Sequence, residues 1–260
     1  MAAEYKGKFV DTHCHLDFPD FDSDRDEVIL RARENSIAFI LNIGSSLENS
    51  FRCVALAKQY EMVFASVGCH PHEADRITPQ VVAQLKGLVK SEKVVAVGEI
   101  GLDYFKNYSG PENQEFLFRA QLQIAREYGL PVVVHCRQSQ KDVMRIMREY
   151  MPLKAVIHCF SGDEDFLREC LDSGFYISYT CNITYKKAED LRRLVGLTPL
   201  NRLMLETDAP FLSPEGFRGR RNEPFHIKLL ASEVACLKKT NVEEIAEVTT
   251  ANAVAFFKLV

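Results

Sequence analysis

Residues 131–136 read PVVVHC, and this short run indicates the fold of the chain. Its valines are too continuously apolar for a sheet that is wetted on one face, so we expect a strand covered by helices on both faces. A histidine, His135, follows the valines directly. Residues 155–159 (AVIHC) repeat the pattern, and residues 94–99 (VVAVGE) end in a carboxylate instead. The sequence therefore predicts buried parallel strands with polar residues at their ends.

Eight such runs alternate with helix-length segments along the 260 residues. We expect strands over residues 9–11, 39–43, 63–67, 94–98, 132–134, 155–157, 175–178 and 203–205. We expect helices over residues 23–35, 47–60, 111–128, 226–238 and 242–257, and one begun by Thr78 and Pro79. Eight β-then-α units are the number that closes a TIM (β/α)₈ barrel, which needs about 250 residues. We predict this α/β fold as a single domain over residues 1–260. An open doubly wound sheet is the alternative, but it would gather its ligands at one switch point.

The composition is that of an ordinary soluble enzyme, with 47% hydrophobic and 26% charged residues. A net charge of −4 provides no basic field for nucleic acid, although bound cations would reverse the potential locally. There is no leader segment and no apolar stretch of about 18 residues, so we expect a cytoplasmic protein without membrane contact. Four cysteines adjoin strand-end histidines, and alternation along a strand should turn them into the packing. They are Cys14, Cys69, Cys136 and Cys159.

Six of the seven histidines stand where a predicted strand ends, and two carboxylates end further strands. These residues are His13, His15, His70, His72, His135, His158, Glu99 and Asp208. A barrel gathers such residues at the C-terminal face of its strands, where active sites lie. Imidazole and carboxylate side chains in one place predict a metal-dependent active site.

His13 and His15 share one strand face, so with an acidic ligand they can hold one divalent ion. His135 and His158 can converge on a second ion, and Glu99 has two oxygens with which to bridge both. Asp208 can complete the first site and accept the proton of the attacking water. Two ions about 3.5–4 Å apart stabilise the attacking and leaving oxygens, and bound water reaches a pKa of about 7. Such donors admit Zn, Mn, Co or Fe, and Mg less readily, without distinguishing among them.

Two arginines lie where phosphate contacts are expected. Arg137 stands two residues beyond His135 and shares its face if the strand continues. Its guanidinium can hold a phosphate through two hydrogen bonds or pair with a loop carboxylate. Arg221, just before a predicted helix, either grips phosphate or locks the last loop.

Six segments of the chain closely resemble the TatD family of metal-dependent hydrolases. They are residues 11–16 (DTHCHL), 68–72 (GCHPH), 98–104 (GEIGLDY), 158–162 (HCFSG), 206–210 (ETDAP) and 221–224 (RNEP). They occur in order from about residue 8 to the C-terminus. This resemblance implies a TIM barrel of the amidohydrolase type that holds two or three divalent cations. It also implies a deoxyribonuclease that removes nucleotides from the 3′ end of DNA. The sequence itself gives no sign of an obligate protein partner.

Carried over by position, the resemblance implies a role for each candidate residue. His13, His15, Glu99 and Asp208 correspond to ligands of one metal, and Glu99, His135 and His158 to ligands of the other. Asp208 corresponds to the general base, and His72 to a position that handles the substrate phosphate. His70 and Asp103 are kept as additional candidates.

Two departures from the family pattern affect the expected substrate but none of the proposed ligands. Cys69 stands where the family commonly has valine, and residues 180–182 (TCN) replace a segment that often contains glycine. The same machinery also serves a carbonyl-ester or amide hydrolase, such as a D-aminoacyl-tRNA deacylase. A carbonyl hydrolase that acts on an uncharged small molecule should tolerate Arg137→Ala. A non-catalytic protein that binds nucleic-acid ends is a third possibility, but it has no need of a general base such as Asp208.

Overall fold

The computed structural model describes residues 5–259, which divide into two compact units. The first unit joins the residues up to Asn42 with those from Tyr176 onward, and the second is Ile43–Phe175. Across the described residues, eight strands alternate with helices, as the sequence predicts. Whether residues 1–260 behave as one domain stays a prediction.

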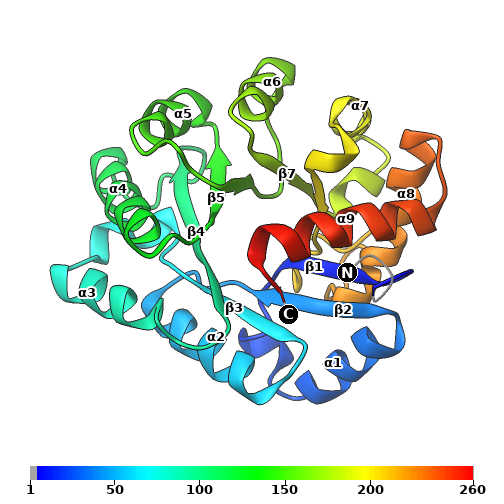
Figure 1. The fold of residues 1–260 in the computed structure, drawn as a ribbon, viewed down its shortest axis with the longest axis horizontal. Helices are drawn as coiled ribbons and strands as arrows, with labels where there is room; N and C mark the ends of the chain where they lie inside the picture. Colours follow the sequence, from blue (N-terminus) through cyan, green and yellow to red (C-terminus); the bar gives the residue numbers. More distant parts are fainter. Residues whose placement is uncertain (1–4, 260) are drawn as a thin grey trace. The chain divides into compact units, whose positions relative to one another are not determined.

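The first unit contains two pairs of parallel strands. β1 (Phe9–Cys14) pairs with β2 (Ile37–Asn42), and β7 (Tyr176–Tyr179) pairs with β8 (Leu203–Leu205). Its helices are α1 (Arg25–Glu34), α7 (Glu189–Leu197), α8 (Ile227–Lys238) and α9 (Val242–Phe257). α9, drawn in red in Figure 1, packs against β1 and β8.

The second unit contains four consecutive parallel strands. They are β3 (Val63–Val67), β4 (Val94–Asp103), β5 (Val132–Arg137) and β6 (Ala155–Ile157). Its helices are α2 (Leu47–Gln59), α3 (Pro79–Leu88), α4 (Pro111–Tyr128), α5 (Gln140–Arg148) and α6 (Glu164–Asp172). α4 and α5 contact each other and lie beside β4 and β5 (Figure 1).

Local signals in the sequence start and stop these helices where expected. The Thr78 side chain accepts a hydrogen bond from the backbone N–H of Val81, and Pro79 opens α3. Gly129 follows α4 with a φ of 64°, a left-handed conformation that glycine adopts without strain. Within the described residues, no helix has the length and hydrophobicity needed to cross a membrane.

β4 is longer than its apolar run predicts, because it continues through Asp103 instead of ending at Gly98. In the added part Gly101 pairs with His135 of β5 at a φ of 141°. A Cβ atom at this position would lie 1.9 Å from the His135 carbonyl oxygen, so only glycine is accommodated. Consequently the expectation that Glu99 and His135 end their strands is wrong. Both lie inside strands, since backbone pairing continues beyond the apolar runs from which the strand ends were predicted.

Candidate metal centre

In the first unit, His13, His15 and Asp208 bring three donor atoms together. The Nε2 atoms of His13 and His15 lie 3.2 Å apart, and each lies 3.6 Å from Oδ1 of Asp208. Both histidines are buried, whereas the side chain of Asp208 keeps 16% of its surface exposed. The cluster therefore has a solvent-facing side on which a substrate can approach.

Backbone hydrogen bonds hold this cluster in place. The N–H of Asp208 donates to the His13 carbonyl at 2.8 Å, and the N–H of His15 donates to the Ala209 carbonyl at 2.7 Å. Buried Asp11 accepts hydrogen bonds from both the N–H and the hydroxyl of Thr207. The end of β1 and the segment after β8 are thus joined directly, which brings residues nearly two hundred positions apart into contact.

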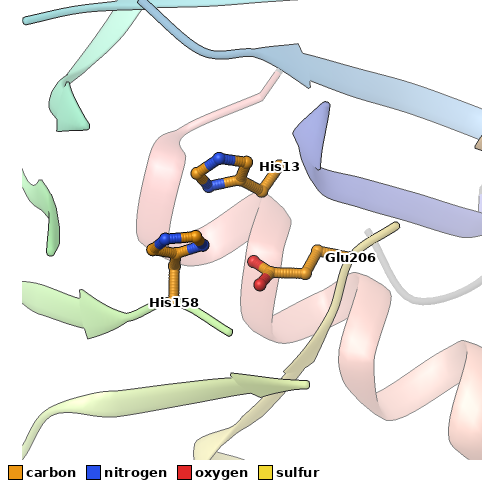
Figure 2. Close-up of side chains that lie close together, drawn as sticks. All are labelled: His13, His158 and Glu206. Atoms are coloured by element: carbon orange, nitrogen blue, oxygen red, sulfur yellow. The ribbon is translucent and has the colours of Figure 1, made fainter. Parts of the chain in front are cut away.

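Glu206 is a carboxylate of this region that our interpretation of the sequence did not single out. It is buried, it accepts a hydrogen bond from the hydroxyl of Ser178 at 2.6 Å, and a carboxylate oxygen lies within 4.8 Å of a ring nitrogen of His13. Figure 2 shows the side chains of His13 and Glu206; the third labelled side chain, His158, belongs to the second unit. The available signal was its position, since Glu206 directly follows the last residue of β8.

In the second unit, three histidines surround Glu99. Oε1 of Glu99 lies 2.7 Å from Nδ1 of His135, 2.7 Å from Nε2 of His158 and 3.6 Å from Nε2 of His70. The facing nitrogens of His135 and His158 are 3.3 Å apart. His70, kept only as an additional candidate from the sequence, therefore belongs to this cluster.

Two members of the second cluster, Glu99 and His70, have protonation states that suit cation binding. Burial would lower the pKa of a third, His135, but its hydrogen bonds to Asp103 and Glu99 raise that pKa above its usual value. Burial would raise the pKa of Glu99, but the His158 and His70 imidazoles and hydrogen bonds from His135 and His158 hold that pKa well below its usual value. Burial lowers the pKa of His70 well below its usual value, although Glu99 opposes this effect. A charged carboxylate and a neutral imidazole are the forms that bind a metal ion.

Asp103 orients the histidines of this cluster. Its Oδ2 lies 3.3 Å from Nε2 of His135 and 2.8 Å from Nε2 of His72. Its Oδ1 accepts the backbone N–H groups of Phe105 and Lys106, each at 2.9 Å. Burial would raise the pKa of Asp103, but the hydrogen bonds from His135, the Lys106 backbone and His72 keep it well below its usual value. Asp103 thus stands behind His135, where a carboxylate fixes the ring orientation of a metal-bound histidine.

Two buried glutamines of α4, which the sequence did not mark as functional, support the same residues. Oε1 of Gln114 accepts the N–H of Asp103 at 2.9 Å, and Nε2 donates to the Asp103 carbonyl at 3.2 Å. Gln121 makes the same pair of bonds with Cys69, at 2.7 and 3.0 Å. Cys69 itself is buried, as expected of a residue that faces the packing. Both glutamines lie on the apolar face of α4, and a polar residue in that position was the signal in the sequence that could have identified them.

The two predicted phosphate-contacting arginines have different surroundings. Arg137 is exposed, and its guanidinium lies 4.0 Å from the ring centre of Phe105. Arg221 is bound to Asp24 through two hydrogen bonds of 2.7 and 2.6 Å and to Glu223 through one of 3.0 Å. Its guanidinium also lies over the ring of Phe21. These contacts are the ones expected if Arg221 locks the last loop. A phosphate contact by Arg221 stays a prediction.

The donor sets are suited to divalent cations. An ion with four ligands at about 2.1 Å in tetrahedral geometry separates those ligands by about 3.4 Å. The separations within the His13, His15 and Asp208 cluster, 3.2 and 3.6 Å, match this value. His70, Glu99 and His135 offer ligand atoms that all lie within 4.8 Å of one another. Imidazole with carboxylate is a donor set for Zn, Mn, Fe or Co, and which of these is bound stays a prediction.

Comparisons with known proteins agree with this geometry. The family model described as TatD related DNase matches residues 10–258. A protein of Erwinia amylovora, named 3′-5′ ssDNA/RNA exonuclease TatD, is 40% identical over 257 residues, which are 96% of this chain and 99% of that protein. A Bacillus subtilis protein named uncharacterized metal-dependent hydrolase YabD is 38% identical over 251 residues, covering 96% of this chain and 98% of the relative.

A solved structure supports the same assignment. The crystal structure of YJJV, a TatD homologue from Escherichia coli K12, superimposes with a TM-score of 0.92 at 33% identity, covering 97% of this chain and 98% of the other. The predicted (β/α)₈ fold class and the resemblance to the TatD family are thereby confirmed. This chain belongs to the TatD-related DNase family and is a metal-dependent hydrolase.

Proposed function

We propose that this protein is a divalent-metal-dependent exonuclease that removes nucleotides from the 3′ end of single-stranded nucleic acid. The observation that supports the proposal most is the pair of histidine–carboxylate clusters, His13 with His15 and Asp208, and Glu99 with three histidines. They occur in a chain 40% identical to a relative named 3′-5′ ssDNA/RNA exonuclease TatD. The substrate class thus comes from the relative's name, and the chemistry from the side chains.

In this proposal each cluster holds one divalent cation, two for each chain. His13, His15 and Asp208 hold the first, and Glu99, His135 and His158 hold the second, with His70 beside it. Bound cations supply Lewis-acid chemistry: they lower the pKa of a water molecule and offset charge on the phosphoryl oxygens. A shared role for Glu99 at both cations stays a prediction.

Asp208 is the proposed general base. It is the most exposed donor of its cluster, with 16% of its side chain accessible, so a water molecule can reach its carboxylate. A carboxylate so placed accepts the proton that the attacking water loses. No nucleophilic side chain is needed, and the incoming oxygen displaces the 3′ nucleotide directly.

His72 and Arg137 are the proposed contacts to the substrate phosphate. His72 keeps 26% of its side chain accessible while its Nε2 atom lies 2.8 Å from Asp103, which fixes the orientation of the ring. Arg137 is exposed, with its guanidinium held over the Phe105 ring. A planar guanidinium with free donors is suited to a phosphate through two hydrogen bonds.

The test is digestion of a 5′-labelled single-stranded DNA or RNA oligonucleotide with Mn²⁺ or Mg²⁺ added. A ladder that shortens from the 3′ end, and that Asp208→Asn abolishes, supports the proposal. An intact oligonucleotide, despite metal content verified by elemental analysis, contradicts it and makes a carbonyl substrate such as D-aminoacyl-tRNA the next to assay. Arg137→Ala further separates the phosphodiesterase from a carbonyl hydrolase of uncharged small molecules, because only the phosphodiesterase depends on a phosphate contact.

The cellular location is part of the same proposal. Cys14, Cys69 and Cys136 are buried thiols, and burial raises the pKa of Cys69 and of Cys136 to about 12. Thiols kept protonated and enclosed are suited to the reducing cytoplasm, where we expect the enzyme to work.

A further inference from the structure

A pocket in the first unit lies next to the His13, His15 and Asp208 cluster. It is an open pocket of about 480 Å³, formed largely by the loop that follows Asp208. Its lining includes Asp20, Tyr185, Phe211, Arg218, Arg220 and Arg221. Pockets that hold small ligands measure about 300–1,000 Å³, so this one has room for a nucleotide.

Phe211 connects the pocket with the candidate metal ligands. Its ring contacts that of His15 at 6.3 Å between centres, in an edge-to-face arrangement. Its backbone N–H donates to the Asp208 carbonyl at 2.8 Å. Phe211 itself is half exposed. A group bound in the pocket therefore lies one side chain away from the proposed site of hydrolysis.

Arg218 and Arg220 supply positive charge to the pocket. The guanidinium of Arg218 lies 4.5 Å from the ring centre of Tyr185. Both arginines are exposed, and among the described residues neither forms an ion pair, whereas neighbouring Arg221 is engaged by Asp24 and Glu223. Two such cations in a chain of net charge −4 are suited to an anionic ligand. Asp20 on the pocket wall limits this field without cancelling it.

The loop that carries the arginines is held in shape by its own hydrogen bonds. The hydroxyl of Ser213 donates to the Arg220 carbonyl, and the N–H of Arg220 donates to the Phe217 carbonyl at 3.0 Å. The N–H of Glu215 donates to the Thr184 hydroxyl at 2.8 Å. Gly219, at a φ of 83°, makes the turn between the two arginines. The pocket is thus preformed, and little ordering is needed when a ligand binds.

We propose that this pocket binds a nucleotide of the substrate strand next to the scissile linkage, with Arg218 and Arg220 on its phosphate and Phe211 stacked on its base. The inference rests on the proposed exonuclease function and extends it. Stacking on an aromatic ring accepts any base, and charged contacts to phosphate carry no sequence information. The pocket would make the enzyme select a polynucleotide strand over an isolated phosphodiester, without preference for sequence.

Binding is tested separately from hydrolysis. The probe is a fluorescein-labelled phosphorothioate decathymidylate, which resists cleavage, measured by fluorescence anisotropy with Mg²⁺ present. The double variant Arg218→Ala/Arg220→Ala should bind about 10- to 100-fold more weakly. The slope of log Kd against log salt concentration should be smaller by about one to two than in the unsubstituted protein. Phe211→Ala should weaken binding without changing the salt dependence, because it removes stacking and no charge.

The matched control is Arg33→Ala/Lys228→Ala, which removes two exposed positive charges from α1 and α8 of the same unit. It should bind the probe as the unsubstituted protein does. Equal affinities of the pocket variant and this control would overturn the proposal, because the binding would then reflect net charge alone.

Hydrolysis is measured with the decathymidylate phosphodiester and with bis(p-nitrophenyl) phosphate, which has no neighbouring nucleotide. The ratio of the two kcat/KM values should fall at least about tenfold in the pocket variant and stay constant in the control. An unchanged ratio contradicts the pocket assignment. If the unsubstituted protein binds the probe through the two arginines yet cleaves neither substrate, the proposed function fails while the pocket assignment stands.

Discussion

Asp208 is joined to His13 twice, by a 2.8 Å hydrogen bond from its N–H to the His13 carbonyl and by a carboxylate 3.6 Å from the His13 Nε2 atom. Asp208 adopts a φ of 57°, a left-handed conformation that is unfavourable for most residues. The backbone bond holds the residue in this conformation, and the conformation turns its carboxylate toward the histidines. The position of the proposed base is therefore determined by main-chain geometry.

Asp208→Asn should retain the fold and lose turnover. Asparagine tolerates the left-handed region as well as aspartate does, so thermal unfolding should be unchanged. Its neutral amide cannot accept the proton of water, so kcat should fall by about 100- to 10,000-fold. The measurement is hydrolysis of a 5′-labelled oligonucleotide with Mn²⁺. The control is Asp165→Asn, which changes an exposed residue of α6. Near-normal rates in a metal-replete variant would refute the assigned role.

His135→Gln should lower the metal content of the purified protein by about one ion per chain, because His135 shares the second cluster with Glu99 and has Asp103 behind it. His226→Gln is the control, since His226 is hydrogen-bonded to Asn222 and lies outside both clusters. Elemental analysis by mass spectrometry measures the content. Chelation should abolish activity, and added Mn²⁺ should restore it in the control but not in His135→Gln.

Gly101→Ala should destabilise the protein severely, whereas Gly87→Ala should not. A Cβ at Gly101 would meet the His135 carbonyl oxygen, and the φ of 141° is unsuited to alanine. We expect a loss of about 3 kcal/mol or more in the free energy of unfolding. Gly87 lies exposed in α3, where a Cβ would have no other atom within 4 Å, so alanine should stabilise by about 0.5–1 kcal/mol. Urea denaturation measures both, and similar effects would contradict the role assigned to Gly101 in β4.

The ion pair of Asp24 with Arg221 should contribute stability that acid removes. Hydrogen bonds from Arg221 hold the pKa of Asp24 below its usual value. For an acid with a lowered folded pKa, the contribution is complete above the unfolded pKa of about 3.9 and is lost as the pH falls through the folded pKa. Asp24→Asn should therefore cost about 0.5–1 kcal/mol at pH 6.5, since both groups are partly exposed.

The check is the difference in unfolding free energy between the unsubstituted protein and Asp24→Asn, followed from pH 6.5 down to pH 3. We expect a constant difference above about pH 5 and a shrinking one below about pH 4. Asp165→Asn, which alters an exposed acid with no ion pair among the described contacts, provides the comparison. A difference that does not change with pH would contradict a stabilising contribution from the charge of Asp24.

Patterns within a few residues of sequence were sufficient for much of this structure. Strand alternation placed His13 and His15 on one face and turned Cys14 into the packing, where it is buried. The cap at Thr78 and the glycine after α4 were predicted correctly, because both depend on local backbone chemistry. The residue types at the strand ends were likewise enough to predict a metal-dependent active site, since few other sites need so many imidazoles and carboxylates.

Tertiary structure alone decided the functions that depend on partners far away in the chain. Asp103 orients His72 and His135, Gln114 supports Asp103, and Arg221 pairs with Asp24 across 197 positions of sequence. An arginine read in isolation can bind phosphate or a carboxylate equally well. Its role is determined by the charged group that the fold brings within hydrogen-bonding distance. That group is set by how the backbone packs, and backbone packing cannot be inferred from a local sequence pattern.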